Sequence, residues 1–281
     1  LISVIVPIYC EALIIEAAYR QLTDVLRLLE NYRYELIFVD DGSSDPSLSI
    51  IKSLASRDSR LKVIRFSRNF GHQSAITAGI QKSRGDAVIV IDADLQDPPA
   101  LIPKMIRSWE KGNRVVYGKR IRRKGESWFK KASASAFYRF INFLSDTDIP
   151  TDTGDFRLID RVVADEINRL GEHNRFVRGL VSWVGFPQTA IEYVREPRLA
   201  GETKFSLKRM IHFAFDGIIS FSNKPLRLSL NLGFCAIIVA FIVLFYGLAM
   251  HWTGRTIRGW TSTMVTILFL GGIQLFMIGI I

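Results

Sequence analysis

Two long segments near the C-terminal end of the chain contain no charged residue. The first runs from Ser229 to Met250 and the second from Thr261 to Ile281. Roughly 20 consecutive apolar residues are enough to cross the hydrocarbon core of a bilayer, and a helix inside a soluble protein rarely lacks charge for so long. The connection between the segments, His251 to Trp260, is short. We therefore predict a transmembrane helical hairpin made of residues 229–250 and 261–281.

Basic residues are distributed unevenly around this predicted hairpin. The net charge of the chain is +10, and the loop of the hairpin carries only Arg255 and Arg258. The segment before the first span carries Arg195, Arg198, Lys204, Lys208, Arg209, Lys224 and Arg227. Because cytoplasmic loops are enriched in Lys and Arg, we expect a multi-pass membrane protein with residues 1–228 in the cytoplasm. A basic chain fixed at a membrane favours phosphorylated and lipid partners, and we expect no nucleic acid.

The residues before the hairpin alternate between apolar, strand-like runs and amphipathic helical patterns. The expected strands are 2–8, 35–39, 61–66, 87–91 and 114–117, and the expected helices are 12–30, one from 46 onward, 71–82 and 99–111. This alternation predicts an α/β fold with a mostly parallel sheet covered by helices on both faces. A nicotinamide-binding domain would need Gly-x-Gly-x-x-Gly after the first strand, but Pro7 to Ala12 contains no glycine.

Carboxylates follow the most apolar of these strands. Residues 87–91 are apolar throughout and are followed by Asp92, Asp94, Gln96 and Asp97. Open α/β sheets bind ligands at the carboxyl ends of their strands. Two carboxylates with a nearby amide oxygen form a hard-oxygen site for Mg²⁺ or Mn²⁺, which would neutralise a diphosphate. A solvated acidic turn is the alternative interpretation, because an isolated Asp-x-Asp pattern is common.

Polar groups also follow the first two predicted strands. Tyr9 and Glu11 come after the first strand, and Asp40 and Asp41 after the second. Each of these residues could simply end its strand. In a parallel sheet, however, they would meet Asp92 at one edge. An aromatic ring and carboxylates suit a nucleoside, because the ring packs on the base and the carboxylates bind base N–H and ribose hydroxyl groups.

Two further segments, about residues 127–145 and 205–221, repeat apolar residues at helical spacing. Lys and Arg are concentrated at the start of the first one, between Lys119 and Lys131. Either segment could be an ordinary helix that faces the protein core. The alternative is an interfacial helix, with apolar side chains in the bilayer and basic side chains at lipid phosphates.

Several motifs occur in a fixed order along the chain. They are Val6-Pro-Ile-Tyr9 with Glu11, Val39-Asp-Asp-Gly-Ser-Ser-Asp45, Ser67-Arg-Asn-Phe-Gly-His-Gln73, Asp92-Ala-Asp-Leu-Gln-Asp-Pro98, Gly154-Asp-Phe-Arg157 and Ala200-Gly-Glu-Thr-Lys-Phe-Ser206. With them, about residues 1–228 resemble the family 2 glycosyltransferases that charge polyprenyl phosphates. Bactoprenol glucosyltransferases are the closest likeness, and dolichol-phosphate mannose synthases are more distant. The family usually has Asn where this chain has Cys10.

This resemblance implies a fold of the GT-A type, as in other nucleotide-diphospho-sugar transferases, and a set of site residues. The residues implied to hold the nucleoside are Pro7, Tyr9, Glu11, Val39 and Asp41. Asp92 and Ala93 would contact ribose and phosphate, and the implied metal ligands are Asp94, Gln96 and Asp92. The residues implied to meet the diphosphate or the acceptor phosphate are Arg120, Arg198 and Lys204. Asp155 lies where many relatives keep an acid close to the sugar.

The implied reaction transfers one hexose to polyprenyl (undecaprenyl) phosphate at the cytoplasmic face of the cell inner membrane. It depends on Mg²⁺ or Mn²⁺ and inverts the anomeric carbon, with UDP-glucose the first choice of donor by likeness. A GDP-mannose enzyme of the dolichol-phosphate mannose synthase type is one alternative. A processive polysaccharide synthase is another, although residues 174–183 lack its Gln-x-x-Arg-Trp spacing.

Two further alternatives concern binding and assembly. The chain could be a non-catalytic nucleotide-sugar sensor, but an inactive descendant would have no reason to keep the carboxylate pair. Gly247, Gly271 and Gly272 could allow close packing of membrane helices, so a homo-oligomer is an additional expectation.

Overall fold

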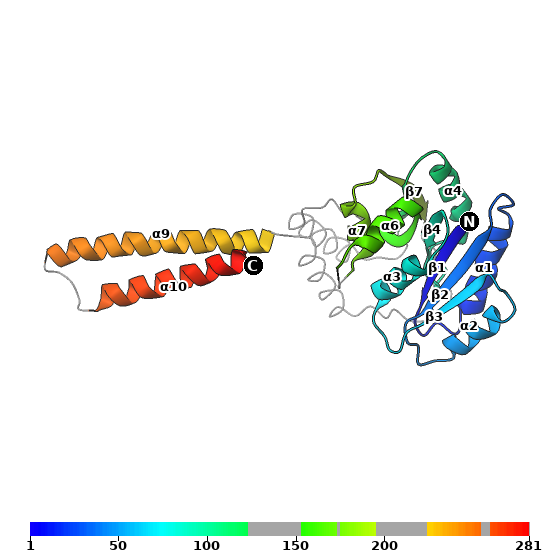
Figure 1. Ribbon diagram of the computed structural model, residues 1–281, viewed down its shortest axis with the longest axis horizontal. Helices are drawn as coiled ribbons and strands as arrows, with labels where there is room; N and C mark the ends of the chain where they lie inside the picture. The colour runs from blue at the N-terminus through cyan, green and yellow to red at the C-terminus, as the bar shows by residue number, and fades with distance from the viewer. Residues whose placement is uncertain (123–152, 173–174, 195–223, 254–258, 281) are drawn as a thin grey trace. The chain divides into compact units, whose positions relative to one another are not determined.

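The computed structural model describes residues 1–122, 153–172, 175–194, 224–253 and 259–280 (Figure 1). These residues belong to two compact units. The described residues up to 194 form an α/β unit, and those from 224 onward form a helical unit. The segments 127–145 and 205–221, for which the sequence left two interpretations open, lie outside the described residues.

A single seven-stranded sheet forms the centre of the α/β unit, with the strand order β3-β2-β1-β4-β6-β5-β7. The strands are β1 (Ile2–Ile8), β2 (Tyr34–Asp40), β3 (Leu61–Arg65), β4 (Ala87–Val90), β5 (Val115–Arg122), β6 (Thr153–Asp160) and β7 (Gln188–Val194). Strands β1 to β4 pair in parallel, and β6 is antiparallel to both β4 and β5. The predicted mostly parallel α/β sheet is therefore confirmed, whereas β6 and β7 were not predicted.

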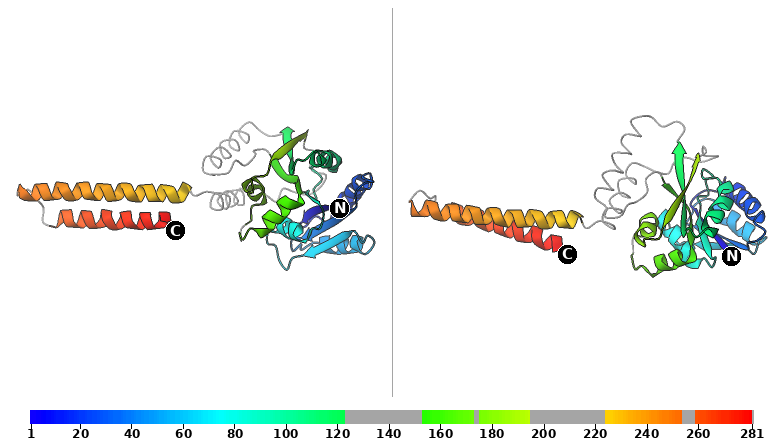
Figure 2. Two further views of the ribbon diagram at one scale, coloured as in Figure 1. Left: turned by 45° about the horizontal axis from the view of Figure 1, so that its top comes forward. Right: turned by 90° about the horizontal axis from the view of Figure 1, so that it is seen from above.

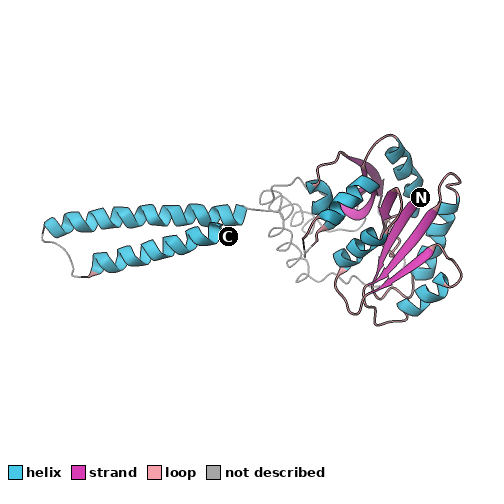
Figure 3. Cartoon of the chain, viewed as in Figure 1, coloured by secondary structure: helices cyan, strands magenta, loops and turns pink. Residues whose placement is uncertain are grey.

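Helices cover both faces of this sheet (Figure 3). One group consists of α1 (Ile15–Arg27), α2 (Ser47–Ala55), the short 3₁₀ helix η1 (Pro99–Leu101) and α4 (Ile102–Glu110). The other group consists of α3 (His72–Lys82), α6 (Arg161–Arg169) and α7 (Val177–Trp183). Alternate residues of a strand point to opposite faces, so each strand contributes side chains to both layers.

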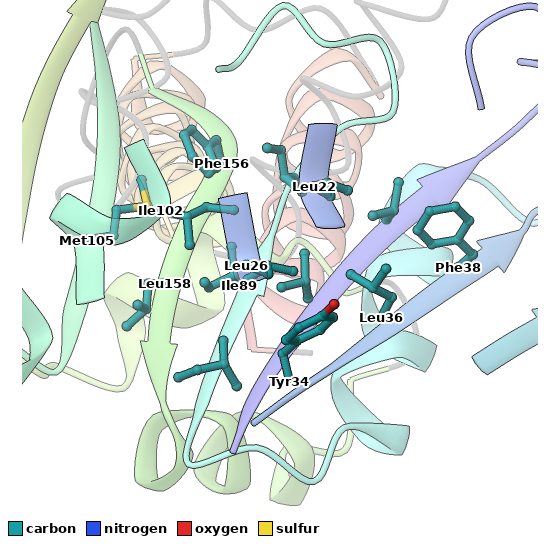
Figure 4. Packing of buried hydrophobic residues seen from close by; sticks show 14 of the residues in the cluster. Leu22, Leu26, Tyr34, Leu36, Phe38, Ile89, Ile102, Met105, Phe156 and Leu158 are labelled. Carbon is teal, nitrogen blue, oxygen red and sulfur yellow. The ribbon is translucent and has the colours of Figure 1, made fainter. Parts of the chain in front are cut away.

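The larger hydrophobic core lies between the sheet and the first group of helices (Figure 4). Leu22 and Leu26 of α1 and Met105 of α4 pack there against the sheet residues Phe38 and Phe156. Full burial of one such side chain contributes about 1.5–3 kcal/mol. On the opposite face, α3 approaches so closely that a methyl group at Gly79 would lie 2.3 Å from the side chain of Ile5.

A buried carboxylate ties the amino ends of the central strands together. Glu35 accepts hydrogen bonds from Ser3 Oγ at 2.5 Å and from the backbone N–H of Arg84 at 2.8 Å, and it pairs with Lys62. Burial raises the pKa of Glu35, but the hydrogen bonds from Lys62, Ser3 and Arg84 outweigh it, so the pKa lies below its ordinary value.

Replacing Glu35 with Ala is expected to lower the free energy of unfolding by about 2–3 kcal/mol, because buried donors lose their acceptor. The measurement is thermal unfolding of the full chain in detergent, with Glu30→Ala, which removes an exposed carboxylate, as the control. A carboxylate with a lowered pKa stabilises the fold above its ordinary pKa and loses this effect as the pH falls through the folded-state pKa. The difference between wild type and variant should therefore shrink in acid, and an unchanged unfolding midpoint at neutral pH would contradict this assignment.

The helical unit contains α9 (Lys224–Trp252) and α10 (Trp260–Ile280), which lie side by side in both views of Figure 2. Within the described residues, Ser229–Met250 is the one helical stretch that is long and apolar enough to cross a membrane, and the apolar stretch Ser262–Ile278 is shorter. A methyl group at Gly233 would lie 2.8 Å from the carbonyl oxygen of Gly272. Small residues that let helix backbones approach are typical of membrane interfaces. Gly272 therefore packs against α9 within the hairpin. The expected homo-oligomer stays a prediction.

Candidate active site

The carboxyl ends of β1, β2 and β4 bring the sequence-predicted residues together. Pro7 pairs directly with Val39 in the β1–β2 ladder, and Ile5 pairs with Val90 in the β1–β4 ladder. Asp92 follows β4 by two residues, so it lies at the same edge as the loop after Pro7. The parallel pairing therefore places the predicted nucleoside residues beside the predicted metal ligands.

The loop after β1, which carries Tyr9 and Glu11, is attached to the loop after β2. The backbone N–H of Cys10 donates to Ser43 Oγ at 2.9 Å, and that of Glu11 donates to Ser47 Oγ at 2.9 Å. These contacts hold the start of the loop, and α1 begins at Ile15 rather than at the predicted residue 12. The two loops form one wall of the candidate site.

Cys10 adopts a backbone conformation that its side chain does not favour. Its φ of 52° lies in the left-handed region. Asn adopts this conformation more often than most non-glycine residues, because its short polar side chain can form a hydrogen bond to the nearby backbone. This conformation gives a physical reason for the Asn that the family usually has at this position.

Replacing Cys10 with Asn is expected to raise the free energy of unfolding by about 1 kcal/mol, because it relieves backbone strain. Cys10→Ala is the matched control, since alanine keeps a Cβ but has no local hydrogen bond to offer. Thermal unfolding of both full-length variants in detergent makes the comparison. Equal unfolding midpoints for the Asn and Ala variants would contradict this explanation.

Asp41 connects the end of β2 to the start of α3. Its carboxylate accepts hydrogen bonds from the backbone N–H groups of Phe70 at 2.7 Å and Gly71 at 3.0 Å. Burial raises the pKa of Asp41 more than these two hydrogen bonds lower it. Glycine is required at position 42, with φ of 68°, because a methyl group there would lie 2.4 Å from the backbone of Arg68. Asp41 thus holds the segment before α3, and its predicted contact with a nucleoside stays a prediction.

Asp92 lies at the centre of the candidate site. Its side chain is 24% exposed, and its Oδ1 atom is buried and makes no hydrogen bond within the described residues. Burial raises the pKa of Asp92, His72 opposes this effect, and the charges of Asp155, Asp97 and Asp94 add to it, so the pKa reaches about 6. An unsatisfied carboxylate among other carboxylates is an arrangement that a cation would stabilise.

The turn after Asp92 is strained and closely packed. Asp94 accepts a hydrogen bond from the backbone N–H of Gln96 at 3.1 Å. Between them, Leu95 has a left-handed φ of 55°, and its buried side chain clusters with Ile14 and Ala18. Strain in a bulky residue persists only where the surroundings enforce it, as at many functional sites. Packing against the start of α1 therefore fixes the backbone that carries Asp94 and Gln96.

Asp92, Asp94 and Gln96 fit a magnesium site that is completed by substrate and water better than a site in which the protein supplies every ligand. Within the described segments, no three side chains of His, Cys, Asp or Glu gather as metal ligands. Mg²⁺ is usually held by one or two carboxylates together with substrate phosphates and water, so a complete protein cage is not required. The pair Asp92 and Asp94, with the amide of Gln96, agrees with that pattern.

Arg120, predicted to meet a phosphate, is held in a buried ion pair. Its Nη2 atom lies 3.2 Å from Asp97, its Nε donates to Tyr193 at 3.1 Å, and Tyr193 donates to Asp97. The Arg120 side chain is 10% exposed. A methyl group at Gly154 would lie 2.2 Å from Arg120 Nη2, so a side chain there would displace the guanidinium. The contact of Arg120 with a phosphate stays a prediction.

Asp155 on β6 is surrounded by donors that the sequence did not reveal as a group. Arg178 of α7 donates to it through Nε at 2.7 Å and Nη2 at 3.0 Å. His72 Nε2 lies 3.1 Å from Asp155, and Gln73 Nε2 lies 3.5 Å from it. Burial raises the pKa of Asp155, but Arg178 and His72 outweigh it and hold the pKa well below its usual range.

His72 bridges the two acidic parts of the site. Its Nε2 atom lies 3.5 Å from Asp92 and 3.1 Å from Asp155. Burial lowers the pKa of His72, but the hydrogen bond to Asp155 and the charge of Asp92 outweigh it and raise the pKa to about 9. The sequence places His72 at a helix start after a glycine, but its partners come from the loop after β4 and from β6. Arg198 and Lys204, the remaining predicted site residues, lie outside the described residues.

Comparisons with known proteins identify the family to which this chain is similar. The model of the glycosyl transferase family 2 matches residues 3–167. The uncharacterized glycosyltransferase YkcC of Bacillus subtilis (strain 168) is 52% identical and covers 99% of this chain and 86% of its own length. The bactoprenol glucosyl transferase of Shigella phage SfX is 40% identical and covers 100% of this chain and 92% of its own length.

A solved structure is also similar to the chain. It is glucosyl-3-phosphoglycerate synthase from Mycobacterium tuberculosis with Mn²⁺, UDP-glucose and phosphoglyceric acid, at 18% identity and a TM-score of 0.47. The match covers 76% of this chain and 75% of that one. The family model and the full-length relatives confirm the predicted enzyme class and its GT-A type fold. The chain therefore belongs to glycosyl transferase family 2.

Proposed function

We propose that this glycosyltransferase transfers a single glucose from UDP-glucose to a polyprenyl phosphate, with inversion at the anomeric carbon. The observation that carries the proposal is the full-length similarity to relatives named bactoprenol glucosyl transferases, at 40% identity. The similarity extends through α9 and α10, beyond the residues that match the family model. A lipid acceptor is consistent with an apolar helix long enough to reach it, as Ser229–Met250 is.

On the donor side, Asp92, Asp94 and Gln96 would hold Mg²⁺ or Mn²⁺. The ion, when bound, supplies positive charge that compensates the departing diphosphate. Pro7 and Val39, paired at the strand ends, would form the floor under the nucleoside. Tyr9, Glu11 and Asp41 would contact the base and ribose, and Ala93 the phosphate.

On the acceptor side, the phosphate nucleophile is already ionised at neutral pH, so a strong general base is unnecessary. Catalysis then consists mainly of positioning and charge compensation. The low pKa and the four donors of Asp155 indicate that this carboxylate orients the side chains bound to it rather than abstracting a proton. Arg198 and Lys204 would bind the acceptor phosphate.

The proposed topology has two membrane spans, with the α/β unit in the cytoplasm at the cell inner membrane. Close packing of α9 on α10 through Gly233 and Gly272 supports a hairpin in which both helices cross together. The excess of Lys and Arg before α9 supports the cytoplasmic orientation.

A screen of nucleotide sugars tests this function. Purified full-length protein is incubated with undecaprenyl phosphate, Mg²⁺ and one labelled donor at a time: UDP-glucose, UDP-galactose, UDP-N-acetylglucosamine or GDP-mannose. We expect labelled lipid carrying one sugar, formed fastest from UDP-glucose, with release of UDP. A polymeric product would indicate a processive synthase, and absence of nucleotide release would indicate a sensor; either result would reject the proposal.

A further inference from the structure

The carboxylate of Asp155 has no capacity left for a substrate. An ionised carboxylate offers about four lone-pair positions. Four donors lie within 3.5 Å of Asp155: Nε and Nη2 of Arg178, Nε2 of His72 and Nε2 of Gln73. The residue is only 5% exposed. Whatever Asp155 contributes to the reaction must therefore act through one of the side chains bound to it.

Among these side chains, His72 is the one that faces outward. Its side chain is 42% exposed, compared with 22% for Arg178. The carboxylates of Asp155 and Asp92 both lie on the Nε2 side of the ring. Within the described residues, Nδ1 makes no hydrogen bond. The imidazole is thus fixed at Nε2, next to the region where the donor is proposed to bind, and Nδ1 is the ring nitrogen left for another partner.

We infer that His72 contacts the sugar being transferred, through a hydrogen bond between Nδ1 and one sugar hydroxyl. This inference rests on the proposed function and adds a substrate-contacting residue to it. A hydroxyl both donates and accepts, so it pairs with Nδ1 whichever ring nitrogen carries the proton. Two carboxylates, Asp92 and Asp155, lie beside the His72 ring, so its surroundings suit a neutral hydroxyl better than another phosphate.

In this arrangement, Asp155 and Arg178 are positioning residues. Arg178 fixes Asp155 with two hydrogen bonds, and Asp155 in turn fixes the His72 ring. Gln73 links the same carboxylate to α7, because its Oε1 accepts the backbone N–H of Val177 at 3.0 Å. Helices α3 and α7 are thereby joined around the residue that orients His72.

The test uses UDP-deoxyglucose analogues, each lacking one sugar hydroxyl, with the full-length protein and undecaprenyl phosphate. For wild type, kcat/KM should fall about tenfold or more with the analogue that lacks the contacted hydroxyl. For His72→Ala, that analogue and UDP-glucose should give kcat/KM values equal within about twofold, because the interaction has already been removed. UDP lacks the transferred hexose, so its affinity should be unchanged.

Two conservative variants separate substrate contact from structural support. In His72→Asn the amide lies near the position of Nδ1, and in His72→Gln it lies near that of Nε2. We expect the Asn variant to retain part of the discrimination between analogues and the Gln variant to lose it. Gln81→Ala, an exposed change on the same helix, is the control and should behave like wild type.

The outcomes are distinguishable. Failure of wild type to use UDP-glucose would reject the proposed donor, and the analogue series is then made for the sugar that wild type does transfer. With an active wild type, the inference is overturned if every analogue loses the same factor in wild type and in His72→Ala. It is equally overturned if His72→Gln restores full activity and discrimination, because support of Asp155 alone would then explain His72.

Discussion

Replacing Asp94 with Asn is expected to slow sugar transfer by about a hundredfold or more, which corresponds to a loss of about 3 kcal/mol of transition-state stabilisation. The change removes a charge but keeps the shape of the side chain. Asp94 Oδ1 accepts the backbone N–H of Gln96, and the amide oxygen of Asn preserves that hydrogen bond. The strained turn at Leu95 should therefore remain intact.

The rate is measured as labelled lipid formed at increasing Mg²⁺ or Mn²⁺ concentration. The variant should need more metal and still reach a lower maximum, while its thermal unfolding matches wild type. Asp24→Asn, which neutralises an exposed acid on α1, is the control and should leave the rate unchanged. Near wild-type turnover of Asp94→Asn, with metal still required, would reject Asp94 as a ligand.

The second large effect concerns the stability of the site. Arg178→Met should lower the free energy of unfolding by about 3–5 kcal/mol, because it leaves the buried Asp155 without its bidentate partner. A double variant that also carries Asp155→Leu should cost less than the sum of the two single changes, since replacing both partners removes the uncompensated charge. Thermal unfolding of the full chain in detergent measures these differences.

An exposed ion pair provides the matched control. Arg169 and Glu166 lie 2.6 Å apart on α6, with side chains that are 74% and 41% exposed. Arg169→Met should change stability by about 0.5 kcal/mol at most, because solvent screens exposed pairs. If Arg178→Met were no more destabilising than Arg169→Met, the ion pair between Arg178 and Asp155 would not stabilise the fold as proposed.

The parts of the fold that depend on local pattern could be predicted from the sequence. The strand Ile2–Ile8 matches its predicted bounds, and the run before Asp92 forms β4 as expected. Parallel pairing of these strands follows from the alternation of strands and helices, and it places Pro7 beside Val39. The edge of the sheet that carries the candidate site was therefore predictable.

What could not be predicted depends on contacts between distant segments. Strand β6 pairs antiparallel with β4, and no local pattern in residues 153–160 predicts an antiparallel strand. The same pairing brings Asp155 next to Asp92 and beneath α3. His72 and Arg178 were visible as residue types, but their roles arise only once β6, α3 and α7 meet. Asn, the usual family residue at position 10, is compatible with the left-handed backbone of Cys10, a conformation that the sequence alone did not indicate.

We propose that the carboxylates at the end of β4 hold a divalent cation on the donor while a lipid phosphate accepts the sugar. The most direct measurement is transfer of label from UDP-glucose to undecaprenyl phosphate by the full-length protein, before and after chelation with EDTA. We expect a lipid carrying one glucose, no product in EDTA, and recovery when Mg²⁺ or Mn²⁺ is restored. Undiminished transfer in EDTA would contradict it.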